Sequence, residues 1–139
     1  MARSNVIVKM REIAESKLPS DKAILHALGD IKGEVEVLHS QVLVATYVAP
    51  HMSKGGILYT DRKIQEDQFQ GSVGLVVAIG PGAFQDGPIA EFHGVKLKLH
   101  DWVLSQPADG LQLYIREVPC RLFEDTRIRM RVKTPELYW

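Results

Sequence analysis

The side chains that could do chemistry are few and lie far apart along the chain. The five histidines are His26, His39, His51, His93 and His100. No two of them are four residues apart on a predicted helix, as a helical metal site would require. Two pairs of titratable groups that could serve in general acid–base catalysis, His100–Asp101 and Glu124–Asp125, fall at predicted turns, where solvated carboxylates are ordinary. We therefore predict no metal site and no enzyme, unless the fold brings His93, His100 and Asp101 together in one cleft.

Cysteine chemistry and cofactor motifs are equally sparse. Cys120 is the only cysteine, so the chain can form neither an internal disulfide nor a thiolate zinc site. It lies in an apolar predicted strand, where a thiol behaves as a small buried hydrophobe. The sequence contains no P-loop, no nucleophile elbow and no EF-hand loop, and residues 80–82 predict a hairpin turn rather than a phosphate-binding loop. We predict that the protein uses no cofactor.

Composition and charge exclude several classes of partner. The chain has 139 residues, 45% of them apolar, which suits one folded domain. Lys plus Arg number 17, as do Asp plus Glu, so no net charge draws the protein to nucleic acid or to an anionic membrane. The apolar stretches are far shorter than the roughly 18 to 20 residues of a membrane span, and the first residues lack the apolar core of a signal peptide. We expect a soluble, cytoplasmic protein.

The first 33 residues are predicted to form a helical extension. Apolar residues recur at helical spacing over residues 5–16, and Asn5 is available as the N-cap. A second helix is predicted over residues 20–29, with Ser20 as its cap and Gly29 as its stop. These two helices precede a change of period at Glu34.

Residues 34–139 follow the period of β-strands. From Glu34 onward, Val35, Val37, Val42 and Val44 alternate with polar or outward positions, which predicts half-buried strands. Further strands are predicted over residues 72–79, 95–99, 102–105, 111–116, 120–123 and 128–132. Short strands separated by turn signals favour a small all-β barrel or sandwich.

Two segments invite a functional reading. Residues 49–70 are rich in glycine and polar groups and lack strong periodicity, and a connection of that length is uncommon in a compact domain unless it is functional. Tyr138 and Trp139 place two aromatic side chains at the end of the chain, where exposure would reduce solubility. We predict that this pair packs on a neighbouring subunit, with docking on the same chain as the alternative.

Five segments, taken in order and spacing, resemble the chaperonin-10 (GroES-like) co-chaperonins. They are residues 38–44, 53–59, 74–82, 95–103 and 123–128. The resemblance covers about residues 36–132 and implies a small, irregular GroES-like β-barrel. It further implies a homo-oligomeric ring of seven subunits that caps a large, ATP-driven chaperonin, and a roof hairpin over residues 82–94.

The resemblance also implies which residues bind the partner. In the family a mobile loop carries at its tip Gly-Gly followed by three apolar residues. The matching residues are Gly55, Gly56, Ile57, Leu58 and Tyr59. Tyr59 stands where an aliphatic residue is usual. The alternative is that Ile57 and Leu58 begin an ordinary strand packed on the barrel.

The departures from the family leave two functions open. The helical extension is additional, Ser40 stands where the family commonly has Asp, and His100 where it commonly has Gly. The C-terminal half looks more like the divergent members encoded by bacteriophages. This resemblance implies one of two functions. The first is a co-chaperonin that assists protein folding in the host cytoplasm, with phage capsid protein as one substrate; the second is a virion structural protein, for capsid decoration or connection, that reuses the fold.

Overall fold

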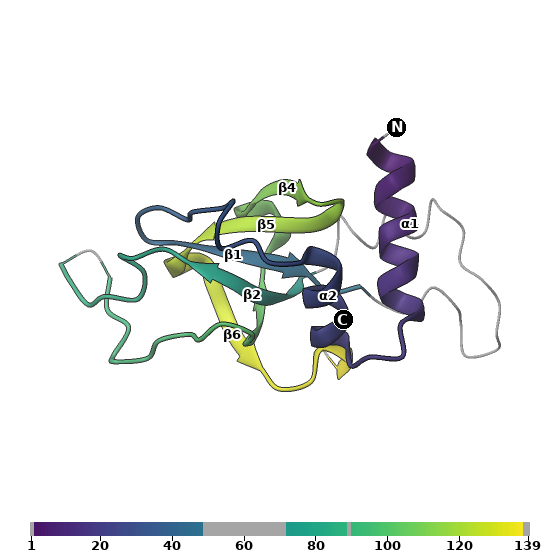
Figure 1. The fold of residues 1–139 in the computed structure, drawn as a ribbon. Helices are drawn as coiled ribbons and strands as arrows, with labels where there is room; N and C mark the ends of the chain where they lie inside the picture. Colours follow the sequence, from purple (N-terminus) through teal and green to yellow (C-terminus); the bar gives the residue numbers. More distant parts are fainter. Residues whose placement is uncertain (1, 49–71, 89, 138–139) are drawn as a thin grey trace.

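The computed structural model describes residues 2–48, 72–88 and 90–137 (Figure 1). The helices of the described chain are α1 (Ala2–Glu15) and α2 (Ser20–Leu28), and its strands are β1 (Gln41–Thr46), β2 (Val73–Ile79), β3 (Trp102–Ser105), β4 (Leu111–Ile115), β5 (Val118–Glu124) and β6 (Ile128–Val132). Three short 3-10 helices complete it: η1 (Pro107–Asp109), η2 (Asp125–Arg127) and η3 (Pro135–Leu137). No helix among the described residues is long and apolar enough to cross a membrane.

The six strands form one antiparallel sheet in the order β4-β5-β1-β2-β3-β6. The register of β1 on β2 shifts between Leu43 and Val44, and that of β3 on β6 shifts between Leu104 and Ser105. Such irregularities increase local twist, and β6 runs obliquely to β1 in Figure 1. The predicted fold class, an all-β body with an N-terminal helical extension, is confirmed.

Strand β1 is buried on both faces, so the prediction of a half-buried strand was wrong here. Leu43 and Ala45 belong to a hydrophobic cluster that includes the apolar faces of both helices. Val42 and Val44 point the other way, into a second cluster with Phe84 and other apolar residues. Because the helices cover the face that would otherwise meet solvent, both sets of alternating side chains lose contact with water.

The two helices end differently from one another. Helix α1 starts at Ala2, so Asn5 lies inside the helix, and the prediction that Asn5 caps it was wrong. The N-cap of α2 is Pro19, without a side-chain capping bond, and Ser20 is the first helical residue, so the prediction that Ser20 caps the helix was wrong. Gly29 stops α2 as predicted: its φ is 72°, and its N–H donates to the Leu25 carbonyl at 2.9 Å. The division at residue 33 stays a prediction, although helices and sheet share one core cluster.

Two predicted strands are absent from the described chain. Residues 34–38 follow a turn in which the N–H groups of Glu34 and Val35 both donate to the Ile31 carbonyl, which removes them from any sheet ladder. Residues 95–99 also lie outside the strands and lead into a turn at His100, whose φ is 75°. The remaining predicted strands are present, with ends displaced by two residues at most.

Candidate functional site

The residues predicted to bind a partner lie outside the described chain, and so do the two terminal aromatic residues. The first set is Gly55, Gly56, Ile57, Leu58 and Tyr59, and the second is Tyr138 and Trp139. Both assignments stay predictions. The structure describes the frame from which residues 49–71 leave and to which they return.

The frame is formed by the adjacent ends of β1 and β2, and we call Tyr47, Val48, Ser72 and Val73 the loop root. The Tyr47 N–H donates to the Val73 carbonyl at 2.9 Å, so the two ends of the segment leave the sheet side by side. Tyr47, Val48 and Val73 are all buried, and the Tyr47 ring meets Trp102 edge-on with centroids 5.7 Å apart. The root is therefore packed into the core rather than loosely attached.

The Tyr47 hydroxyl lies among groups from both ends of the chain. It is hydrogen-bonded to the Ser20 side chain, and burial, together with the nearby Glu136 carboxylate, raises the pKa of Tyr47. Ser20 Oγ in turn donates to Glu136 Oε1 at 3.2 Å. From the sequence, Ser20 was predicted only as a helix cap, and no pattern indicated that Glu136 contacts it.

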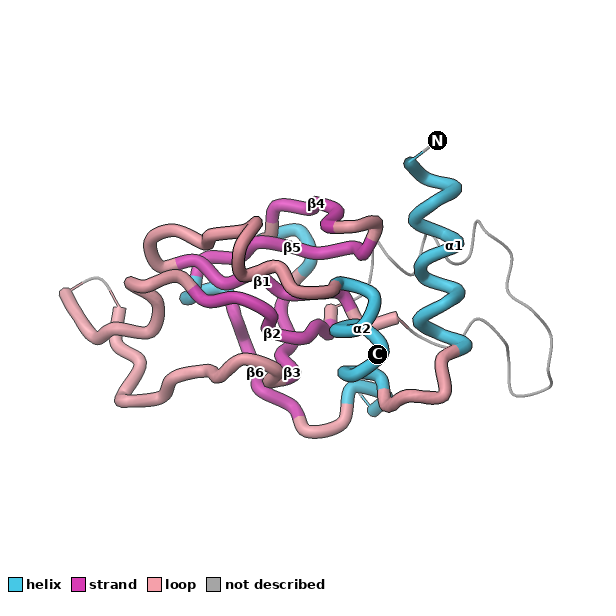
Figure 2. The backbone as a smooth tube through the Cα atoms, viewed as in Figure 1, coloured by secondary structure: helices cyan, strands magenta, loops and turns pink. Residues whose placement is uncertain are grey.

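The opposite end of the sheet carries the segment 80–94, which we call the roof loop; Figure 2 shows that loops gather at this end, away from the helices. Its turn passes close to the segment before β1: a Cβ on Gly80 would lie 2.3 Å from the His39 carbonyl oxygen, so only glycine fits. The described part of the roof loop contains turns and no strand. A turn is present as predicted, at residues 81–84, but no strand follows it among the described residues up to 94, so the prediction that it closes a hairpin was wrong. The roof hairpin expected over residues 82–94 is for the same reason a loop in the described chain.

A buried carboxylate ties the roof loop to the sheet. Asp125 Oδ2 accepts a hydrogen bond from the Phe84 N–H at 3.0 Å, and both residues are buried. Phe84 has a φ of 61°, and its ring meets Phe92 edge-on with centroids 5.6 Å apart. The prediction that Asp125 is a solvated turn residue was wrong, because the roof loop covers its carboxylate and shields it from water.

A second carboxylate, on the exposed Asp86, organises the tip of the roof loop. Its Oδ1 accepts the N–H of Phe92 and, at 3.2 Å, the N–H of His93. Hydrogen bonds from backbone groups, with that of Phe92 the strongest, lower the pKa of Asp86. The Gly87 N–H donates to the Ala90 carbonyl at 3.0 Å and closes the turn.

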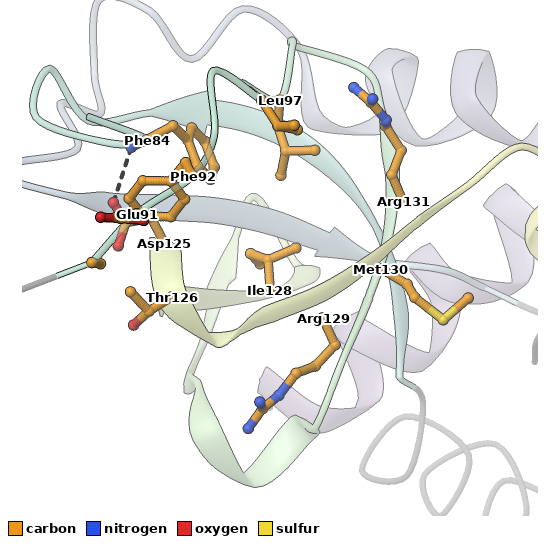
Figure 3. Close-up of a pocket in the computed structure, with 12 residues that line it drawn as sticks. Phe84, Glu91, Phe92, Leu97, Asp125, Thr126, Ile128, Arg129, Met130 and Arg131 are labelled. Atoms are coloured by element: carbon orange, nitrogen blue, oxygen red, sulfur yellow. Dashed lines mark hydrogen bonds between the residues drawn. The ribbon is translucent and has the colours of Figure 1, made fainter. Parts of the chain in front are cut away.

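An apolar cavity of about 420 Å³ lies between the roof loop and β6 (Figure 3). Phe84, Phe92 and Leu97 face Ile128 across it, whereas Arg131 and Arg129 extend away at its margin. The cavity is further lined by Ala90, Glu91, Val95, Asp125, Thr126 and Met130. Such a surface suits apolar contact better than acid–base chemistry.

Of the groups considered for catalysis, only Asp125 lines this cavity among the described residues. His93, His100, Asp101 and Glu124 are absent from its lining. The Asp101 carboxylate accepts the Lys98 N–H at 2.9 Å and lies 3.5 Å from an Arg131 nitrogen. Within the described ranges, no three histidine, cysteine or acidic side chains are grouped so as to hold a metal ion.

Cys120 is fully buried in β5, as predicted for a small apolar side chain. Burial raises the pKa of its thiol to about 12. A thiol that stays protonated at neutral pH is a poor nucleophile.

Comparison with known proteins gives one family. The family model described as Chaperonin 10 Kd subunit matches residues 34–129. No curated protein matches the chain. The matched region begins after α2 and ends within β6, so both helices and η3 lie outside it.

Proposed function

Because the chain belongs to the chaperonin 10 family, we propose that it is a co-chaperonin that forms a ring, binds a large ATP-driven chaperonin and so assists protein folding in the cytoplasm. Members of this family partner with a large chaperonin, form oligomers and are not enzymes. The proposed contact residues are Gly55, Gly56, Ile57, Leu58 and Tyr59. The observation that supports them is the loop root, where Tyr47 and Val73 hold both ends of residues 49–71 together.

The energetics of such a contact favour several copies over one. Burying Ile57 and Leu58 on a partner yields about 25 cal/mol per Å² of apolar surface. Ordering the segment opposes this by roughly 1 to 2 kcal/mol per residue, so a single copy binds weakly. Once one copy is bound, the others face a high effective concentration, and the ring binds far more tightly than its subunit.

Assembly is supported by the edges of the sheet. In the described chain, β4 and β6 each pair with only one neighbouring strand. Both edges also expose apolar side chains, Leu111 at 66% and Met130 at 47%. Unpaired, partly apolar edges favour pairing with another chain, and a closed ring would cover them. Tyr138 and Trp139 are proposed as further subunit contacts, because aromatic residues are enriched in interfaces.

The alternative function, a virion structural protein, would use the two helices and the terminal aromatic residues to contact neighbouring subunits. Both helices instead turn an apolar face, including Met10 and Ile24, into the chain's own core. Among the side chains of α1 that the structure describes, from residue 5 on, the exposed apolar one is Val8, at 56%. A helix pair already packed on its own sheet offers little apolar surface to a neighbour, which favours the co-chaperonin. If the chain comes from a bacteriophage, its capsid protein is the folding substrate that we propose.

The test is the double substitution Ile57→Ser with Leu58→Ser. We expect it to abolish binding to a purified chaperonin in the presence of nucleotide, measured by calorimetry, because the apolar contact is lost in every subunit of the ring. Light scattering should show the same assembly state as the unsubstituted protein.

The matched control is Val8→Ser, which removes an exposed apolar side chain from α1. It should leave chaperonin binding unchanged. Undiminished binding by the double variant would overturn the assignment of the binding residues, and no binding by the unsubstituted ring would overturn the function itself.

A further inference from the structure

From the contacts around the loop root we infer that Ser20, Tyr47 and Glu136, which we call the junction, position the partner-binding segment. The inference rests on the proposed function, since the partner in question is the chaperonin. It goes beyond the family assignment, because Ser20 and Glu136 both lie outside the matched residues 34–129. The helical extension and the C-terminal segment thereby act on a segment that the matched region contains.

The junction joins three parts of the chain. Ser20 is the first residue of α2, Tyr47 directly follows β1, and Glu136 lies in η3. Ser20 Oγ donates to Glu136 Oε1 at 3.2 Å, across 116 positions of sequence. The Tyr47 hydroxyl is hydrogen-bonded to the Ser20 side chain, which links the root to both other parts. The described C-terminal segment, yellow in Figure 1, passes beside α2, as this contact requires.

The junction lies at a cavity between the helices and the root. The cavity has a volume of about 130 Å³. Its lining includes Ile13, Leu18 and Ile24 from the extension and Tyr47 and Val48 from the root, with Ser20 and Glu136 beside them. The Tyr47 ring is held by its edge-on contact with Trp102, and the junction adds polar contacts at its hydroxyl, on the side of the cavity.

A fixed root favours binding by reducing the ordering that must occur when the partner arrives. Each root residue that is already held in one conformation does not have to be immobilised at that moment. From the usual entropy of fixing a backbone residue, releasing one residue weakens the affinity of each loop roughly five- to thirtyfold. Because all subunits of a ring contribute, the effect on the assembled ring is larger.

The experiment compares Tyr47→Phe and Ser20→Ala with the control Tyr114→Phe, which removes a hydroxyl from the half-exposed side chain on β4. Amide hydrogen exchange is measured at Tyr47 and Val73, and at Val44 in the middle of β1. Chaperonin affinity is measured by calorimetry at a temperature at which all variants are folded. We expect faster exchange at the two root amides, unchanged exchange at Val44, and affinity lower by about tenfold per loop.

If the hydroxyl groups of Tyr47 and Ser20 have only a structural role, their removal should speed exchange throughout the sheet, or lower the melting temperature without changing exchange at the root. Either result overturns the inference. Unchanged exchange at the root, or faster exchange with unchanged affinity, also overturns it. If the unsubstituted protein binds no chaperonin, the proposed function fails, and the exchange data then decide by themselves whether the junction holds the root. Glu136→Gln, which keeps an acceptor for Ser20, should retain root protection.

Discussion

The roof loop depends on one buried hydrogen bond, and Asp125→Ala should reveal how much it contributes. The Phe84 N–H and its acceptor, Asp125 Oδ2, are 3.0 Å apart, and both residues are less than a tenth exposed. Removing the carboxylate strands a buried N–H and deletes a hydrogen bond to a charged group, a loss of about 1.5 to 3 kcal/mol. The backbone hydrogen bonds of Asp125 survive the substitution: its N–H donates to the Ser40 carbonyl at 2.9 Å, and its carbonyl accepts the Ile128 N–H.

The assay is urea unfolding at one fixed protein concentration, because assembly makes stability concentration-dependent. With a urea dependence of about 1 to 3 kcal/mol per M, the midpoint should fall by roughly 1 M. Asp125→Asn keeps a side-chain acceptor and should lose less than Asp125→Ala. Exchange of the Phe84 amide should accelerate more than that of amides in β1.

The matched control is Glu124→Ala, because Glu124 is the exposed neighbour of Asp125. Its free energy of unfolding should change by no more than about 0.5 kcal/mol. A loss below about 0.5 kcal/mol for Asp125→Ala, or an equal loss for Glu124→Ala, would refute the reasoning that the buried carboxylate holds the roof loop.

Two further predictions concern a helix end and a titrating group. Gly29→Ala should lower the free energy of unfolding by about 1 to 2 kcal/mol, because the φ of Gly29 is 72° and the new Cβ would lie 2.2 Å from an Arg116 nitrogen that donates to the Leu28 carbonyl. The control is Gly33→Ala, because a Cβ on Gly33 would have no neighbour within 4 Å. Equal losses of stability for the two variants in chemical denaturation would contradict this account. The pKa of Asp86 is lowered from its ordinary value of 3.8, so its carboxylate stabilises the roof loop fully above that pH and loses this effect as the pH falls through the lower, folded-state pKa. NMR should therefore show the Phe92 amide shifting in acid, below about pH 5, and a transition that persists in Asp86→Ala would assign it to another group.

Local signals were sufficient for several elements. Residues 128–132 were predicted with the bounds that β6 has, because an apolar–polar alternation stands between clear turn residues. Gly29 marked the end of α2 because a positive φ is a requirement that few residues other than glycine meet. Each of these features is decided within a few residues of the chain.

The failures concern features decided by distant residues. The pattern at residues 34–38 fits a strand, but a strand needs a neighbouring strand to pair with. The N–H groups of Glu34 and Val35 instead donate to the Ile31 carbonyl. Asp125 looked solvated because its partner, Phe84, is 41 positions away. Ser20 and Glu136 are 116 positions apart, and neither has a sequence pattern that indicates the other. Contacts of this kind follow from topology, which local periodicity does not contain.

The run of apolar residues in β1 explains why the two helices pack on the sheet as part of its core rather than form a separate appendage. Val42, Leu43, Val44 and Ala45 are consecutive and all buried, a pattern typical of a strand covered on both sides. The inner side of β1 faces the cluster that contains Phe84, whereas the outer side faces the helices. Without the extension, the outer apolar side chains of β1 and β5 would meet water, at a cost of about 25 cal/mol per Å². The sequence of β1 therefore already requires a cover, and because the same helices border Tyr47 and Val48, their packing links the stability of the sheet to the placement of the loop root.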